Sequence, residues 1–250
     1  TPSGYFLRAG TTGVLTVASS APADSRRLRM CILRGAGKAV VVRSLANPAD
    51  CFVYKGHNQP VTCAKFAPNG FWVASGDASG HVRVWAWDHP EHLLKGQELA
   101  VMACPVKDID WDPDSKRIVA VGDGTNKQMK VFMWDTGNQL GDASGPTKRV
   151  LSCAFRPSRP FRVVTASEDF GVAHFKGPPF KFDKTTKKHT QFVNCVRFSP
   201  DGSRFFSASS DKEVAIFDGK DGSLVIEKVV AKGSVYAAAW SPDNAQILTA

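Results

Sequence analysis

Several features that often mark chemistry are missing from this sequence of 250 residues. Its six cysteines form no CxxC pair and no metal-ligand spacing, and there is no N-x-S/T sequon. No apolar run approaches the roughly 18 residues that a membrane span requires, and no secretory signal peptide is present. We therefore expect reduced core thiols, a cytoplasmic location, and no metal, cofactor or membrane partner.

The composition is that of a globular protein with an excess of positive charge. The chain is 43% hydrophobic and 22% charged, with a net charge of +9, so it is long enough to bury a large core. A nucleic-acid partner is not expected, because no such motif is present and only Phe180 and Phe182 stand among the lysines. An acidic protein surface and a solvated basic face both remain open. The basic clusters are Arg26, Arg27 and Arg29, and Lys181, Lys184, Lys187 and Lys188.

One short pattern occurs five times. Each copy is a valine, four residues, an aromatic residue and a turn with proline at its second position, and the valines are 45, 44, 43 and 42 residues apart. A near-constant period in this range indicates a repeat architecture. The copies are Val61 to Phe66, Val106 to Trp111, Val150 to Phe155, Val193 to Phe198 and Val235 to Trp240.

The copy at Val193 to Phe198 shows the expected local structure. Its residues alternate at the strand period of two, with Val193, Cys195 and Arg197 on one face, and Pro200 to Gly202 then supply turn chemistry. Two more strands are expected at 204–208 and 214–217, and a fourth within 223–230. Four antiparallel strands in about 43 residues make one blade of a β-propeller. The predicted blades are 30–56, 57–100, 101–145, 146–188, 189–231 and an incomplete 232–250.

The repeats carry the marks of a known family. The stretch YKGHNQPVTCAKFAPNGFWVASGDASGHVRVW has a Gly56-His57 opening and ends at Trp85, and it resembles a WD40 repeat. KKHTQFVNCVRFSPDGSRFFSASSDKEVAIFD resembles another, with His189 and a terminal Phe217-Asp218. The fold class that this resemblance implies is all-β, a WD40 propeller of four-stranded antiparallel blades.

Further stretches specify a subfamily. DSKRI, SRPFR, GPPFKF and FVNCVRFSPDG occur in this order, and from about Met30 onward the chain resembles the actin-interacting protein 1 (WD-repeat protein 1) family. That family joins two seven-bladed rings. The resemblance therefore predicts that the chain is an N-terminal propeller fragment, and the missing initiator methionine at Thr1 favours the same view. Residues 1–29 match poorly; we expect weak order there, or a strand that closes the ring.

The family resemblance also implies function and site. It implies a non-enzymatic protein that binds actin filaments and cooperates with ADF/cofilin in their disassembly. Glu168, Phe182 and Phe192 are implied as contacts to cofilin-decorated actin, and Phe180 and Asp123 lie in the same candidate regions. Packing remains an alternative for Phe182 and Phe192, and a solvated turn for Glu168. Family members tend to carry a glutamate-containing segment where this chain has 123–129, so partner choice could differ.

A second group of polar residues resembles a hydrolase triad. His189, Ser207 and Asp211 are a Ser-His-Asp set, but in a WD40 blade these residue types form a structural hydrogen-bond network. Phe217 stands where a tryptophan would donate to the serine. A second network is expected at His57, Ser75 and Trp85, where Ser79 replaces the turn aspartate, and either Asp77 substitutes or the network lacks one member.

Three alternatives remain beside actin binding. A general WD40 scaffold in a multiprotein complex is the first, although it gives no reason for GPPFKF and DSKRI. An enzyme using His189, Ser207 and Asp211 is the second. The third is a phosphate loop in GAGKAV (35–40), which lacks the required upstream glycine and the hydroxyl residue after lysine. We expect a hairpin turn there instead.

Overall fold

The chain forms a ring of antiparallel sheets. The computed structural model describes residues 5–9, 13–20, 29–44, 47, 49, 51–87, 98–124, 128–142 and 145–250, without the side chains of 5–34, 142 and 227–229. In this part of the chain every regular element is a strand, and neighbouring strands pair antiparallel in sequence order. No helix in the same residues could cross a membrane.

Six sheets follow one another along the chain. The first contains β1 (Tyr5–Ala9), β2 (Gly13–Ser20), β3 (Arg29–Ala36), β4 (Ala39–Ser44) and β5 (Cys51–Tyr54). The second contains β6 (Val61–Phe66), β7 (Trp72–Asp77), β8 (His81–Ala86) and β9 (Leu99–Ala100), and the third contains β10 (Val106–Trp111), β11 (Arg117–Gly122), β12 (Met129–Met133) and β13 (Gln139–Asp142).

The fourth sheet contains β14 (Val150–Phe155), β15 (Arg162–Ser167), β16 (Val172–Lys176) and β17 (Lys181–Thr186). The fifth contains β18 (Val193–Phe198), β19 (Arg204–Ser209), β20 (Glu213–Asp218) and β21 (Leu224–Val230), and the sixth contains β22 (Ala238–Trp240) and β23 (Ile247–Thr249). The predicted four-stranded unit is therefore confirmed, with β21 as the fourth strand that the sequence only suggested.

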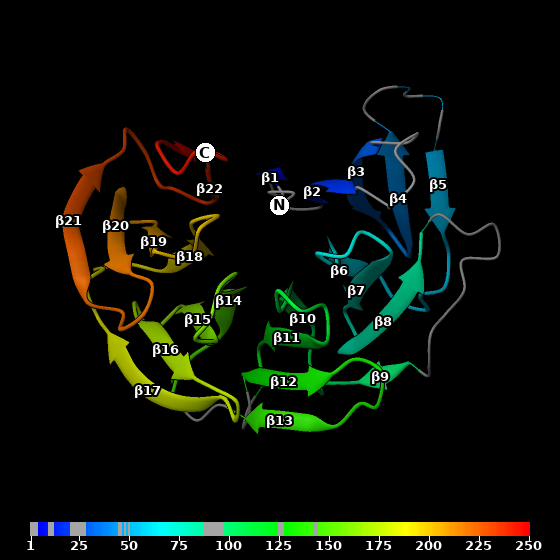
Figure 1. Ribbon diagram of the computed structural model, residues 1–250, viewed down its shortest axis with the longest axis horizontal. Coiled ribbons are helices and arrows are strands. Elements are labelled where there is room, and N and C mark those ends of the chain that lie inside the picture. Colours follow the sequence, from blue (N-terminus) through cyan, green and yellow to red (C-terminus); the bar gives the residue numbers. More distant parts are fainter. Residues whose placement is uncertain are drawn as a thin grey trace.

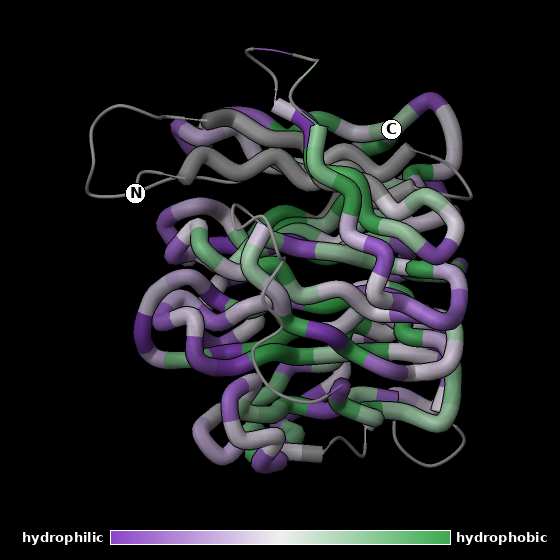
Figure 2. The backbone as a smooth tube through the Cα atoms, turned by 90° about the vertical axis from the view of Figure 1, so that its right-hand side faces the viewer, coloured by the Kyte–Doolittle hydropathy of each residue, from purple (hydrophilic) through white to green (hydrophobic). Residues whose placement is uncertain are grey.

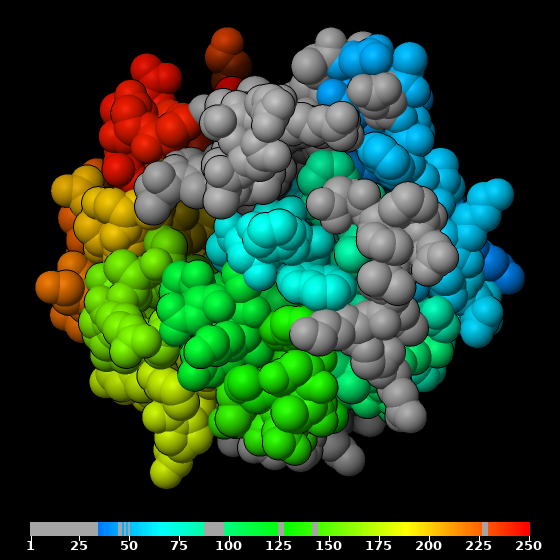
Figure 3. Space-filling model, turned by 45° about the vertical axis from the view of Figure 1, so that its right-hand side comes forward, coloured from blue at the N-terminus to red at the C-terminus, as the bar shows by residue number. Residues whose placement is uncertain are grey.

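The sheets stand around a common centre (Figure 1). The first strands β6, β10, β14 and β18 lie innermost, each against the next, and β22 contacts both β18 and β1. In the space-filling view the sequence colours pass around the surface in chain order (Figure 3). The arrangement is a partial β-propeller.

Two faces of the ring carry the turns. We call the "linker face" the one that bears the links between sheets and the loops joining second to third strands; the "hairpin face" bears the loops joining first to second and third to fourth strands. Seen edge-on, hydrophilic segments gather at these turns and hydrophobic segments lie between them (Figure 2). Loops held on such a rigid scaffold are where binding residues are expected.

The first sheet is larger than the sequence predicts. It begins at Tyr5, because β1 and β2 form from residues that we expected to be weakly ordered, and β1 contacts β22. The rest of the predicted N-terminal segment lies outside the described residues. The predicted hairpin at GAGKAV is present: β3 and β4 pair from Ala36 and Ala39 outward, with Gly37 at φ 57° in the turn.

A repeated β-bulge corrects the predicted alternation of the inner strands. In β18 the register shifts between Val193 and Cys195, so Val193 lies on the same side as Val196 and Phe198 while Cys195 faces the sixth sheet. The bulge recurs in β6, β10 and β14. Both sides of these strands are buried between neighbouring sheets, so the aromatic end residue packs in the core.

The cysteine prediction holds for three thiols. Cys63, Cys153 and Cys195 are buried, as expected of small strand fillers, and burial raises the pKa of the Cys153 thiol further than any nearby charge does. Cys51 is exposed and Cys104 is partly exposed, so these two are not core residues. Cys31 lies among the residues whose side chains are not described.

A polar network ties the inner strands of the second to fifth sheets together. Asp108 on β10 accepts hydrogen bonds from Ser152 Oγ (2.9 Å) and the Cys153 N–H (3.1 Å) on β14, and Arg197 Nη1 on β18 lies 3.0 Å from the same carboxylate. Lys65 on β6 pairs with Asp110. Burial acts to lower the pKa of Arg197, but Asp108 and the other acidic groups nearby together outweigh it and raise that pKa.

Candidate functional site

The second and fifth sheets contain the same buried histidine network. His189 Nδ1 lies 2.9 Å from Asp211 Oδ2, and His189 Nε2 lies 2.7 Å from Ser207 Oγ. Because a carboxylate can only accept, Nδ1 carries the proton and the Ser207 hydroxyl donates to Nε2. His57 repeats this geometry with Asp77 at 2.9 Å and Ser75 at 2.7 Å. Asp77 therefore occupies the place that Ser79 leaves open.

The two networks differ in their fourth member. Trp85 Nε1 donates to Ser75 Oγ at 3.0 Å, whereas Phe217 offers no donor and stacks on Phe205 with ring centroids 4.9 Å apart. Ser75 and Ser207 are both 0% exposed. A hydroxyl without access to a substrate has no use as a nucleophile, so this geometry serves the fold.

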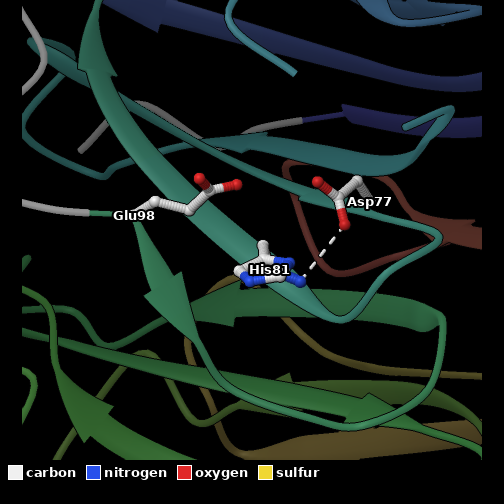
Figure 4. Close-up of side chains that lie close together, drawn as sticks. All are labelled: Asp77, His81 and Glu98. Atoms are coloured by element: carbon white, nitrogen blue, oxygen red, sulfur yellow. Dashed lines mark hydrogen bonds between the residues drawn. The ribbon is translucent and has the colours of Figure 1, made fainter. Parts of the chain in front are cut away.

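Two groups of side chains have metal-like composition, Asp77, His81 and Glu98, and His189, Asp211 and Glu213. In the first group, Figure 4 shows the three residues coming from the end of β7, the start of β8 and the residue before β9. Their ligand atoms already have partners. Arg83 contacts both Glu98 oxygens, at 3.2 and 2.7 Å, and Asp77 binds His57, the His81 N–H and Ser79.

A cation in the first group would have to displace the Arg83 guanidinium. In the second group both His189 nitrogens are occupied by Ser207 and Asp211. Both groups are therefore poor metal sites, because their ligand atoms are already bonded to other side chains. We assign neither group a metal.

The fourth sheet builds its turn differently. Gly145 and Pro146 replace the Gly-His opening, and Thr147 takes the histidine's place on the aspartate: its N–H (2.8 Å) and Oγ1 (3.0 Å) both donate to Asp169 Oδ2. Asp169 Oδ1 accepts from the Gly171 N–H at 3.0 Å. Burial acts to raise the pKa of Asp169, but these hydrogen bonds together lower it. The buried carboxylate fixes the turn that carries Glu168 and Phe170.

Two predicted site residues meet on the linker face through an arginine. Asp123 follows β11, Glu168 follows β15, and Arg149 precedes β14. Arg149 Nη2 lies 2.6 Å from Asp123 Oδ2, and Nη1 lies 3.6 Å from Glu168 Oε1. The Glu168 N–H also donates to the Arg149 carbonyl at 2.9 Å. The trio holds two carboxylates against one cation, which leaves one net negative charge on the surface.

Phe192 belongs to the same face. It precedes β18, is 45% exposed, and stacks on Phe170 of the β15–β16 turn with ring centroids 5.9 Å apart. The exposed aromatic surface therefore adjoins the turn that bears Glu168. The ring of Phe192 packs on one face, while the exposed remainder is accessible to a partner.

Phe182 and Phe180 lie elsewhere. In the β16–β17 register Lys176 pairs with Lys181 and Val172 pairs with Thr186, so Phe182, 42% exposed, lies near the hairpin face, away from Glu168. Phe180 is 1% exposed and packs edge-on against Phe155 in the core. The expectation that Phe180 offers a partner contact is therefore wrong, because its ring fills the space between the third and fourth sheets.

Arg149, Asp169 and Phe170 were not predicted from the sequence. Asp169 had a signal: Ser167-Glu168-Asp169 aligns with Ser209-Ser210-Asp211 in the next repeat. The role of Arg149 depends on two loops from neighbouring sheets, which no single-repeat pattern reveals. Among the lysines of the predicted basic cluster, Lys181 and Lys187 are exposed and Lys184 is half-buried; Arg26 and Arg27 lie outside the described residues.

Comparison with known sequences places the chain in a family. The WD40 model (WD domain, G-beta repeat) matches residues 48–86, 92–135 and 180–218. Together with the ring of four-stranded sheets, this defines a WD40-repeat propeller protein. Within that class, the chain belongs to the family of actin-interacting protein 1 and WD repeat-containing protein 1, as the following relatives show.

The similarity extends over most of the chain. Actin-interacting protein 1 of Drosophila melanogaster is 50% identical over 215 residues, which cover 85% of this chain and 35% of that protein. WD repeat-containing protein 1 of Gallus gallus is 48% identical over 217 residues (86% and 36%). Actin-interacting protein 1-2 of Arabidopsis thaliana is 48% identical over 209 residues (82% and 34%). The chain spans about a third of the length of these relatives.

Proposed function

We propose that this protein binds actin filaments decorated with ADF/cofilin and promotes their disassembly, without catalysing a reaction. The observation that carries the proposal is the exposed surface of Asp123, Glu168 and Phe192 on a rigid ring, in a family whose members are named for interacting with actin. An aromatic anchor beside charged groups is typical of binding hot spots. The proposed location is the actin cytoskeleton in the cytoplasm.

The mechanism is differential binding. Cofilin changes the filament that it covers, and a surface that fits the changed filament better than bare actin shifts the equilibrium toward the changed form. The protein can shift this equilibrium by no more than the difference between its binding free energies for the two filament states. The same preference for the cofilin-changed filament lets the protein bind severed ends and keep them from regrowing.

Phe182 is proposed as a second contact. Its ring is exposed near the hairpin face and meets Phe175 edge-on at 5.8 Å. A partner that touches both Phe182 and Phe192 therefore has to reach around the outer strand β17. This geometry makes the two phenylalanines separable by mutation.

High-speed cosedimentation of actin filaments, with and without cofilin, tests the function and the site. With the wild-type protein, we expect less actin in the pellet when cofilin is present. This effect should be smaller with the Phe192→Ala variant and smallest with the double variant Phe182→Ala, Phe192→Ala. Both variants should remain folded, with a small drop in melting temperature, because each ring is partly exposed and lies outside the buried core. No effect of cofilin with the folded wild-type protein would contradict the proposal.

A general WD40 scaffold in a multiprotein complex is the second candidate. It is favoured by the extended loops on two faces, which are available to any protein partner. Pull-down with purified cofilin-decorated filaments separates the two, since a scaffold for other partners would show no cofilin dependence. The third candidate, hydrolysis at Ser207, is disfavoured by the buried hydroxyl.

A further inference from the structure

The turns between second and third strands share a position with positive φ. In the second, fourth and fifth sheets the pairs Gly76 with Val82, Ala166 with Val172, and Ala208 with Val214 each enclose five residues. The fourth of these five has positive φ in every case. These residues are Gly80 (φ 89°), Phe170 (φ 67°) and Lys212 (φ 69°).

Phe170 is an unusual occupant of such a position. Positive φ is costless for glycine, uncommon for other residues, and strained for a bulky side chain. The equivalent residue of the second sheet is Gly80, which shows that the turn itself does not require a side chain. Strain of this kind points to a function for the residue that maintains it.

The position of the Phe170 ring supports that inference. It is partly exposed and stacks on Phe192, which comes from the link to the next sheet (5.9 Å between centroids, 29° between planes). The two rings make an aromatic surface that spans the boundary between the fourth and fifth sheets. Asp169, bonded to Thr147 and Gly171, holds the turn beneath Phe170.

Acidic groups adjoin these rings. Glu168 precedes Phe170 in the same turn, and its carboxylate lies 3.6 Å from Arg149, which binds Asp123 more closely at 2.6 Å. The Glu168 carboxylate is thus the more loosely held of the two, and its side chain is 23% exposed. This negative surface is local, since the chain as a whole carries a charge of +9.

We propose that Phe170 is a contact residue, and that the surface of Phe170, Phe192 and Glu168 receives a partner segment with an apolar side chain next to a basic one. The apolar group lies on the stacked rings, and the basic group completes the ion pair with Glu168. Arg149 is a positioning residue that keeps both carboxylates at the surface. The inference rests on the proposed function, for which it names the chemistry of the segment that binds.

The test compares two glycine variants that relieve the same backbone strain with a control that keeps it. Phe170→Gly removes the ring, Lys212→Gly is the matched change in the fifth sheet, and Phe170→Tyr keeps both the aromatic ring and the strain. The two glycine variants should change the melting temperature by similar small amounts, and Phe170→Tyr should melt near the wild-type temperature. The readout is the protein concentration that gives half-maximal loss of pelleted actin at a fixed cofilin concentration.

We expect Phe170→Gly to raise this concentration roughly tenfold or more, the range of a binding hot spot, while Lys212→Gly and Phe170→Tyr match the wild type. Glu168→Gln should weaken the effect and reduce its dependence on ionic strength, because an ion pair is lost. If Phe170→Gly matches the wild type, this inference fails and the proposed function stands. If the wild type shows no cofilin-dependent loss, both fail.

Discussion

At the scale of single residues, the buried histidines show how a polar group is held inside a propeller. His57 and His189 each use both ring nitrogens, one on a carboxylate and one on a serine hydroxyl. A net hydrogen bond contributes about 1 kcal/mol, but a buried partner left without a bond loses about 1–3 kcal/mol. Deleting one member of a network therefore costs more than the bond itself contributes, because it leaves a buried polar atom without a hydrogen bond.

Truncating the two serines should have unequal effects. Ser75→Ala removes the hydroxyl that bonds both His57 Nε2 and Trp85 Nε1, whereas Ser207→Ala removes a hydroxyl that bonds only His189 among the side chains of its network. We expect losses of unfolding free energy of about 2–4 and about 1–3 kcal/mol respectively. Urea unfolding of the two variants beside wild type measures this. Equal losses would contradict the role given to Trp85.

Acid should destabilise the fold in two stages. Burial lowers the pKa of His57 and His174 below 6.5, despite the raising effects of Asp77 and Asp183. The unfolded chain therefore binds protons that the folded chain does not, and stability is lost as pH falls below about 6.5 toward the folded values. His174→Gln should reduce this first slope in unfolding curves; an unchanged slope would contradict the assignment.

The second stage belongs to carboxylates. For Asp77, Asp169 and Asp211 burial acts to raise the pKa, but their hydrogen bonds outweigh it and place each pKa below 3.8. Their contribution to stability is present above that value and is lost as pH falls through the folded pKa. Asp169→Asn should make the unfolding free energy less dependent on pH in this acid range. An acid limb as steep as that of wild type would contradict the contribution assigned to Asp169.

At the scale of elements, the inner strands are connected by more than packing. Trp111 and Trp240, two of the five repeated aromatics, donate their indole N–H to carbonyls of the preceding inner strand, those of Lys65 and Arg197, at 3.2 Å in both cases. Asp108 and Arg197 add a buried ion pair between the third and fifth sheets. These bonds fix the spacing of neighbouring sheets around the ring.

Removing one partner of that ion pair should be costly. Arg197→Met leaves the Asp108 carboxylate buried with one charge partner fewer, and we expect a loss of about 3–5 kcal/mol in unfolding free energy. The double variant Asp108→Asn, Arg197→Met should recover part of the loss, since the uncompensated charge is gone. Guanidinium unfolding measures both. A loss under about 0.5 kcal/mol in the single variant would show that the pair is unimportant.

Repeats determine how much of these elements can be predicted. The period of 42 to 45 residues and the strand alternation predict the sheets, including the fourth strand at 224–230. The bulge at Val193 and Cys195, the pair of Asp108 with Arg197, and the burial of Phe180 depend on how neighbouring sheets pack. Such contacts join residues one or two repeats apart, which periodicity within one repeat does not encode.

The candidate site shows the same division. Glu168 and Phe192 could be named because the family resemblance implies them, and Asp123 because it begins the segment in which this chain departs from the family. The structure brings all three onto the linker face. Phe182 could be named as well, but its strand register puts it near the hairpin face. The contacts of Arg149 and Phe170 join loops from neighbouring sheets, so the sequence of one repeat does not predict them.

At the scale of the whole molecule, the ring of sheets offers two rigid faces that carry loops. The polar groups with triad or metal composition are buried or already paired. The charged and aromatic side chains of the linker face are the surface that we propose for a protein partner. Under the proposed function, the protein acts by binding one state of the filament more tightly than the other.

The most direct measurement is the rate of filament shortening seen by fluorescence microscopy with actin, cofilin and the full chain, each omitted in turn. We predict rapid shortening only when cofilin and the protein are both present, and a rate close to that of cofilin alone when Phe182→Ala, Phe192→Ala replaces the wild type. Equal rates with and without the folded wild-type protein at saturating cofilin would contradict the proposed function.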